Sequence, residues 1–143
     1  MNSTRGEKEN GGFSLVEIIV VVAIMAVLVG VLAPAYLRYI EKTRKQRDDT
    51  AAEEIRHAAE IIVFSGEYQV TSGTVVVQFD KASGITVTSD PTGNLVAQLQ
   101  ELFGTDLSRV KPESNAYSSS VYKVSIVAPA TPDGYPSMAG AWY

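Results

Sequence analysis

The chain has no cysteine and only one histidine, His57, among its 143 residues. Without cysteine it can form no disulfide, no thiolate nucleophile and no cysteine-ligated zinc site. A single histidine also argues against a histidine-rich metal site. The sequence has no P-loop, no glycine-rich dinucleotide fingerprint and no nucleophile elbow. We therefore expect a protein that is not an enzyme, with no catalytic residue, no metal and no cofactor.

The chain also lacks an excess of basic residues. It has 12 Lys and Arg against 16 Asp and Glu, which gives a net charge of -4 and an isoelectric point near 5.0. A protein that binds nucleic acid by its charge usually carries a basic patch and a high isoelectric point. No specific nucleic-acid partner is predicted.

What the chain does have is one long apolar segment. In residues 13–37, 21 of 25 residues are hydrophobic, and the four exceptions are Ser14, Glu17, Gly30 and Pro34. Residues 18–37 carry no charge, and as a helix they would be about 30 Å long, the thickness of a bilayer's hydrocarbon core. The run is too long for an ordinary secretory signal. A plain membrane anchor explains the length but not the acidic Glu17.

The residues just before this segment decide between these explanations. Residues 11–17 read Gly-Gly-Phe-Ser-Leu-Val-Glu and follow a short charged leader. This pattern resembles the class III signal of type IV prepilins and pseudopilins, in which a glycine precedes Phe and Glu follows four residues later. The resemblance covers residues 11–62. It implies that a prepilin peptidase cleaves between Gly12 and Phe13, that the new amino group of Phe13 is methylated, and that Pro34 is the proline near the end of the family's membrane segment.

Physical roles can be assigned to three residues of this segment, Glu17, Gly30 and Pro34. Cleavage would leave an amino group on Phe13 that is largely protonated at neutral pH, because its reference pKa is about 7.7–8.0. In a bundle of such helices this ammonium could pair with the Glu17 carboxylate of another subunit, where an isolated charge is costly. Pro34 removes a backbone hydrogen bond to Gly30, which predicts a kink or a segment that can extend.

The helical pattern continues to about residue 64 through a stripe of apolar residues, Leu37, Ile40, Ala51, Ile55, Ala58, Ala59 and Ile62. Residues 41–50 contain no apolar residue. Their i,i+4 pairs, Glu41 with Lys45, Arg44 with Asp48 and Lys45 with Asp49, favour a solvated helical neck. The alternative is that the basic residues lie against anionic lipid headgroups; these are Arg38, Lys42, Arg44, Lys45 and Arg47.

The remainder predicts a small α+β head. Alternating apolar residues indicate strands at 74–80 and 85–87, joined by a turn at 80–84, and a third strand at 122–126. Residues 94–103 indicate a short helix that buries Leu95, Leu99, Leu102 and Phe103, and residues 129–143 are expected to be irregular. The predicted fold is a pilin-like lollipop, a long helix packed against a small antiparallel sheet. Its expected parts are a leader (1–12), a transmembrane and assembly half of the helix (13–37), a neck and amphipathic half (38–64) and the head (65–143).

The head offers few candidates for chemistry. Asp80, Asp90, Asp106 and Asp133 fall in expected loops, where turn formation is favoured over calcium binding. His57 is expected at the surface or in packing contacts. Core and lid roles are favoured over an adhesive patch for the C-terminal aromatic residues, Tyr117, Tyr122, Tyr135, Trp142 and Tyr143.

The resemblance thus implies a structural subunit of a type IV pilus, held in the cytoplasmic (inner) membrane with its head extracytoplasmic and then polymerised into a surface filament. The implied partners are copies of itself, other minor pilins, the prepilin peptidase and methyltransferase, the inner-membrane assembly platform and, before assembly, membrane lipid. A pseudopilin of a type II secretion or DNA-uptake machine shares every feature up to the neck. A remoter alternative is a membrane-anchored binding protein that does not polymerise.

Overall fold

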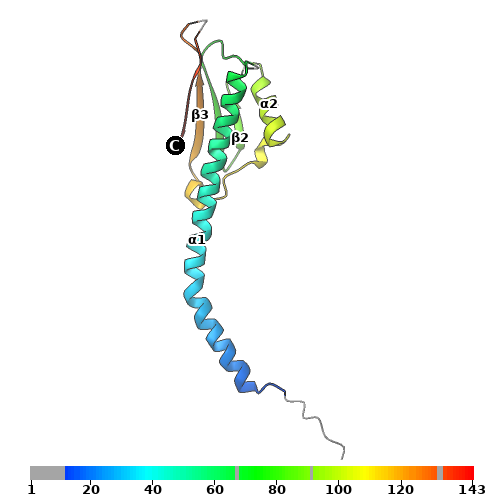
Figure 1. Ribbon diagram of the computed structural model, residues 1–143, viewed down its shortest axis with the longest axis vertical. Coiled ribbons are helices and arrows are strands. Elements are labelled where there is room, and N and C mark those ends of the chain that lie inside the picture. Colours follow the sequence, from blue (N-terminus) through cyan, green and yellow to red (C-terminus); the bar gives the residue numbers. More distant parts are fainter. Residues whose placement is uncertain (1–11, 67, 91, 132–133) are drawn as a thin grey trace, which may run out of the picture. The chain divides into compact units, whose positions relative to one another are not determined.

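The computed structural model describes residues 12–66, 68–90, 92–131 and 134–143 (Figure 1). Its elements are, in chain order, α1 (Leu15–Phe64), β1 (Thr74–Asp80), β2 (Gly84–Thr88), α2 (Asn94–Phe103), two short 3₁₀ helices η1 (Leu107–Arg109) and η2 (Asn115–Tyr117), β3 (Val121–Val127) and β4 (Ser137–Trp142). The long N-terminal helix and the small antiparallel sheet confirm the predicted α+β, pilin-like layout. The chain forms two compact units, residues 1–39 and 40–143, whose boundary falls inside α1.

The sheet of the second unit is antiparallel throughout, with strand order β2-β1-β3-β4. The predicted hairpin joins β1 to β2, and Oδ1 of Asp80 stabilises its turn by accepting hydrogen bonds from the amides of Ala82 and Ser83 at 2.8 and 2.7 Å. Gly84 follows with φ 76°, and a Cβ there would lie 2.6 Å from the carbonyl oxygen of Leu107. Only glycine satisfies both the backbone conformation and the close approach of η1.

The core lies between one face of the sheet and the second half of α1, cyan to green in Figure 1. Alternate residues of a strand face the same side, and the predicted inward residues of β1 and β3 are all buried: Val75, Val77, Phe79, Tyr122, Val124 and Ile126. The predicted stripe of α1 supplies Ile55, Ala58, Ala59 and Ile62, and α2 adds Leu95 and Leu99. The sheet, α1 and α2 therefore share a single hydrophobic core.

Two predictions about the head are wrong. The C-terminal tail is not irregular throughout, because residues 137–142 form strand β4, which pairs with β3 from Val127↔Ser137 to Tyr122↔Trp142. The small residues of β4 give it little alternation in sequence, and its strand conformation comes from pairing with β3. Of the four apolar residues predicted for α2, Leu102 is not buried but 60% exposed, whereas Phe103 packs against the core as predicted.

Candidate assembly site

The acidic residue of the motif, Glu17, lies in the first turn of α1. Its Oε2 accepts a hydrogen bond from the backbone amide of Ser14 at 2.9 Å, and Ser14 is the residue just before the helix. This is half of a capping box, in which an acid three residues into a helix satisfies an amide that the helix leaves unpaired. Sequence reasoning assigned Ser14 no role, although the Ser-x-x-Glu spacing of residues 14 and 17 is the usual signal for this contact.

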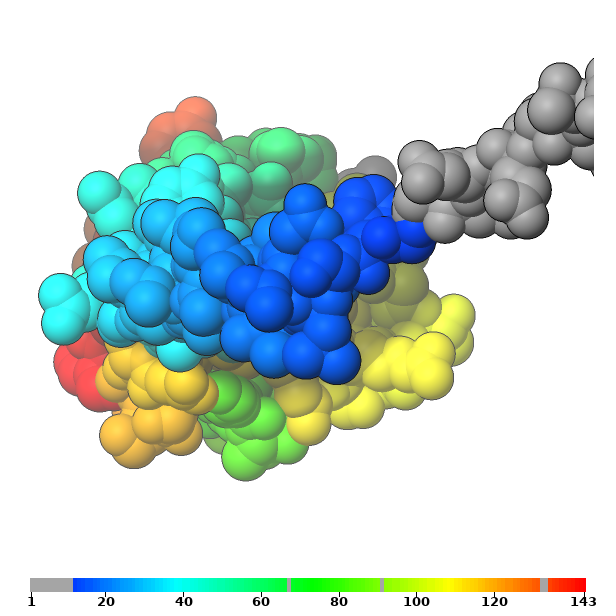
Figure 2. Space-filling view, turned by 90° about the horizontal axis from the view of Figure 1, so that it is seen from below, coloured from blue at the N-terminus to red at the C-terminus, as the bar shows by residue number. Residues whose placement is uncertain are grey.

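The apolar segment that follows is uncovered by the rest of its unit. Every side chain from residue 12 to residue 39 is exposed, including Phe13 at 85% and Val31 at 71%. In the space-filling view these side chains, coloured blue, stand at the surface of the face shown (Figure 2). By length and composition α1 can cross a membrane. An exposed apolar surface of this extent needs either lipid or other protein around it.

Gly30 and Pro34 both lie within α1, which is assigned as helix through both positions. A Cβ on Gly30 would meet no atom within 4 Å, so contacts inside the chain do not require glycine there. Both residues weaken a helix, glycine through backbone entropy and proline through its missing amide hydrogen. The kink or extension at this point stays a prediction.

The neck is not simply solvated, and this corrects the favoured interpretation of residues 41–50. Asp48 is only 3% exposed, and its two carboxylate oxygens accept hydrogen bonds from the amides of Glu113 and Ser114 at 2.9 and 2.7 Å. Oε1 of Glu41 accepts from the Ser114 hydroxyl and the Asn115 amide, both at 2.6 Å, and from the amide of Ala116 at 3.2 Å. These carboxylates satisfy backbone amides that would otherwise lack a partner, because Glu113 and Ser114 precede η2 and Asn115 and Ala116 form its first turn.

We call these contacts the acidic clamp; it consists of Glu41, Asp48 and Asp49 with the loop of residues 113–117. Asp49 completes it by accepting a hydrogen bond from the Tyr117 hydroxyl. The Ser114 hydroxyl and then the two loop amides hold the pKa of Glu41 below its ordinary value. Burial, and then the hydrogen bond to Asp49, raise the pKa of Tyr117 to about 12. The clamp therefore favours the ionised form of Glu41 and the neutral form of Tyr117.

Tyr117 connects the clamp to the C-terminal strand. Its ring stacks on Trp142 of β4 with ring centroids 3.8 Å apart and an interplanar angle of 1°. Trp142 also meets the ring of Tyr122 edge-on at 5.3 Å and that of Phe79 at 6.1 Å. Core and lid roles are thus confirmed for these residues. Tyr135 is 83% exposed and Tyr143 71% exposed, so these two aromatic residues lie outside the core.

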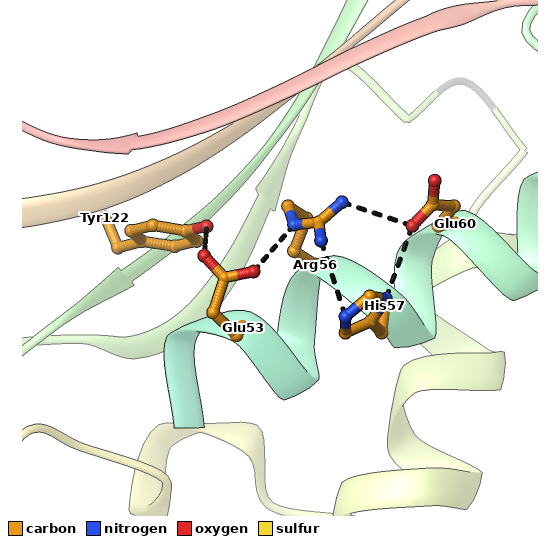
Figure 3. A network of polar contacts seen from close by, with 5 residues as sticks. All are labelled: Glu53, Arg56, His57, Glu60 and Tyr122. Atoms are coloured by element: carbon orange, nitrogen blue, oxygen red, sulfur yellow. Dashed lines mark hydrogen bonds and ion pairs between the residues drawn. The ribbon is translucent and has the colours of Figure 1, made fainter. Parts of the chain in front are cut away.

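A second polar network lies where α1 crosses the sheet (Figure 3). The Tyr122 hydroxyl donates to Glu53 at 3.3 Å, and Arg56 bridges Glu53 at 2.8 Å and Glu60 at 3.2 Å. Arg56 holds the pKa of Glu53 below its ordinary value. His57 extends the network by a 3.4 Å contact from Nδ1 to Glu60, with its side chain 61% exposed. His57 is therefore a surface residue, as one of its two predicted roles states.

The loop aspartates that the structure describes form turns and cap helices. Asp90 accepts from the amides of Thr92, Gly93, Leu95 and Val96 and from the Tyr68 hydroxyl, and thereby caps α2. Burial alone would raise the pKa of Asp90, but these hydrogen bonds outweigh it and lower the pKa. Asp106 caps η1 through Ser108. Among the described residues no three acidic or histidine side chains form a metal-binding group, and Asp133 lies outside those residues.

The N-terminal part of the chain matches a known family. Residues 8–33 match the model of the family described as the prokaryotic N-terminal methylation motif. This stretch contains Gly12, Phe13 and Glu17, together with the apolar segment as far as residue 33. The match confirms the resemblance to type IV pilins and pseudopilins that the sequence predicts.

The chain is also similar in sequence to fimbrial proteins. Two curated fimbrial proteins of Pseudomonas aeruginosa are each 33% identical to the chain over 67 residues, which make up 47% of this chain and 44% of the relative. The match therefore spans less than half the length of these relatives. No solved structure matches the chain. The chain thus carries an N-terminal methylation motif and is similar to fimbrial proteins over less than half of its length.

Proposed function

We propose that this chain is a structural subunit of a type IV pilus, polymerised through its exposed apolar helix into a surface filament. The observation that carries the proposal is the methylation motif placed at the start of a helix whose first 25 residues, 15–39, are all exposed. The similarity to fimbrial proteins supports a filament subunit rather than an enzyme.

Processing comes first in this proposal. The prepilin peptidase cleaves between Gly12 and Phe13, which lie outside the helix and are both exposed, and the new amino group of Phe13 is methylated. Residues 13–37 then anchor the subunit in the cytoplasmic membrane, with the head on the extracytoplasmic side. The leader, residues 1–12, is removed, and with it the charges of residues 5–9 that would otherwise enter the helix bundle.

Glu17 has two successive partners in this scheme. In the free subunit its carboxylate accepts a hydrogen bond from the Ser14 amide. This bond partly compensates the free-energy cost of placing an acidic side chain in an apolar segment. In the filament it accepts from the Phe13 ammonium of a neighbouring copy, so that both charges are paired and the axial register is set. Gly30 and Pro34 supply a segment that can extend as the helices pack.

The remaining partners follow from this scheme. The subunit passes from lipid to the inner-membrane assembly platform, and then to copies of itself and to minor pilins. Neighbouring helices replace lipid around the apolar surface. No cofactor takes part.

The proposal is tested by Glu17→Gln and Glu17→Ala in cells that assemble filaments, with Glu54→Gln as a matched control, because Glu54 is an exposed acid on the same helix. The yield of sheared filaments is compared with the amount of processed subunit in the membrane. We expect both Glu17 variants to be processed but to assemble poorly, and the control to assemble normally. Filament yields at the wild-type level in the Glu17 variants would show that this carboxylate does not direct docking.

The same preparation separates the filament proposals. Long sheared fibres that contain this chain support a pilus. Its presence only in short structures that span the periplasm would support a pseudopilin of a secretion or DNA-uptake machine. A processed chain that forms no filament at all would support a membrane-anchored binding protein.

A further inference from the structure

Acidic and basic side chains of the neck have different surroundings. The acids Glu41, Asp48 and Asp49 are turned toward the loop of residues 113–117 and are half-buried or buried. The basic side chains of the same stretch are all exposed, and we call them the basic collar: Lys42, Arg44, Lys45 and Arg47. Because the acids are engaged by the loop, the exposed surface of this part of α1 is more basic than its sequence indicates.

The collar follows the apolar segment directly. Lys42 is five residues and Arg47 ten residues beyond Leu37, the last apolar residue of that segment, which corresponds to about 7.5 and 15 Å of helix. The headgroup layer on each side of a bilayer's hydrocarbon core is about 5–7 Å thick. Long basic side chains can bend back toward it, and the screening length at physiological salt is about 8 Å. All four positions are therefore within electrostatic reach of the headgroups.

The collar residues point to several sides of the helix. Taking Lys42 as reference, Arg44, Lys45 and Arg47 point about 200°, 300° and 140° around an ideal helix of 3.6 residues per turn. Lys45 lies on the side of the helix that residues 113–117 cover, whereas the other three point to the remaining sides. A single protein partner would contact only part of that surface, whereas lipid can contact all of it. Two of the four have a contact within the head, since Arg47 pairs with Glu113 at 3.0 Å and Lys45 lies 5.7 Å from the centre of the Tyr117 ring. Arg47 nevertheless keeps 70% of its side-chain surface exposed.

We propose that the basic collar binds the phosphate groups of anionic phospholipids while the subunit is anchored in the membrane. The inference rests on the membrane stage of the proposed function. Bound headgroups fix the depth at which the apolar segment lies in the bilayer, and they retain the subunit until assembly exchanges lipid for neighbouring copies.

The test uses the full chain reconstituted in vesicles of phosphatidylcholine with one fifth phosphatidylglycerol. Because the chain has no cysteine, Gln46→Cys gives a single labelling site within the collar for a fluorophore. Quenching is measured with phosphatidylglycerol that carries a nitroxide near the headgroup, and then with phosphatidylcholine labelled in the same way. The ratio of the two quenching efficiencies gives the local enrichment of the anionic lipid.

Two collar variants and one control share this background. The first changes all four collar residues to glutamine. The second, Lys42→Gln with Arg44→Gln, leaves the two contacts to the loop intact. The control, Arg109→Gln with Lys123→Gln, removes two charges, as the double variant does, from exposed or half-buried positions elsewhere in the head.

We expect severalfold enrichment of phosphatidylglycerol around the unmodified collar, since each basic side chain at an anionic surface contributes a factor of about five before screening. The enrichment should fall roughly to one in the fourfold variant, to an intermediate value in the double variant, and stay unchanged in the control. It should also fall as salt is raised.

Equal quenching by the two lipids, or enrichment that survives in the fourfold variant, would overturn the inference. A third result would also overturn it: energy transfer between labelled copies that is lost in the fourfold variant, with no enrichment of lipid. The partner of the collar would then be an acidic surface of a second copy. A chain that does not float with the vesicles at all would refute the membrane anchoring itself. A chain that floats but shows no enrichment would refute only the lipid site.

Discussion

Replacing Asp48 should destabilise the head more than any other change of a single charge on α1. Asp48 lies in a stretch without apolar residues, yet its side chain is 3% exposed. Both of its oxygens accept from the loop, one from the amide of Glu113 and one from the amide of Ser114. Ser114 itself is fully buried, so water cannot replace the lost acceptor there.

The magnitude follows from the two amides left unpaired. A buried donor that loses its partner costs about 1–3 kcal/mol. We therefore expect Asp48→Ala to lower the free energy of unfolding by about 3 kcal/mol. Asp48→Asn keeps one acceptor oxygen but turns an amide donor toward the second loop amide, and should cost about half as much. Glu54→Ala, at an exposed position of the same helix, should change stability by at most about 0.5 kcal/mol.

The assay is denaturant unfolding of the full chain in detergent, followed by the fluorescence of Trp142, the only tryptophan. Trp142 stacks on Tyr117, whose hydroxyl donates to the clamp, so its emission reports on this region. If Asp48→Ala unfolded at the same denaturant concentration as Glu54→Ala, the acidic clamp would not stabilise the head and the reasoning would fail.

Three further perturbations test the core, the hairpin and the charges. Leu99→Ala should cost about 2–5 kcal/mol in thermal unfolding because Leu99 is fully buried, whereas Leu102→Ala on the same helix should be nearly neutral. Gly84→Ala should cost at least about 1–2 kcal/mol by the same measurement, since it adds left-handed strain to a Cβ only 2.6 Å from a carbonyl oxygen. The midpoint of unfolding should fall in acid, because the pKa of Asp90 is lower in the folded state than in the unfolded state. The stabilisation by the Asp90 carboxylate is therefore present above its unfolded-state pKa and is lost as pH falls through its folded-state pKa. The midpoints should also fall in alkali. Burial, and then the hydrogen bond to Asp90, raise the pKa of Tyr68 to about 12, so its stabilisation is lost as pH rises through that value. A midpoint that did not change with pH at either end would contradict these shifts.

The regular elements with strong periodicity could be predicted from the sequence. The α2 helix has the predicted bounds, and the buried residues of β1 and β3 are those of the predicted alternation. Local pattern suffices here, because one face of each element is buried against a single core. Strand β4 could not be found in this way, because its stability depends on pairing with β3.

The contacts of the neck could not be predicted from the sequence. Its charges suggest i,i+4 pairs along one helix, whereas its acids bind amides at 113–116, more than 60 residues away in sequence. Such contacts depend on tertiary packing, and no local spacing indicates them. The capping contact between Ser14 and Glu17 is different, since its three-residue spacing could have been read from the sequence.

The motif itself was identifiable from residues 11–17, because glycine, Phe and Glu occur there at the spacing of the family's signal and lead straight into an apolar run. What the motif does depends on other molecules, the peptidase and neighbouring copies. Those roles of Gly12, Phe13 and Glu17 therefore remain to be tested by experiment.

The most direct test is N-terminal sequencing, with mass spectrometry, of the mature chain purified from cells that contain a prepilin peptidase. The proposed processing predicts N-methylated Phe13 as the first residue. An intact Met1, or a new terminus at Tyr36 produced by ordinary signal cleavage, would contradict it.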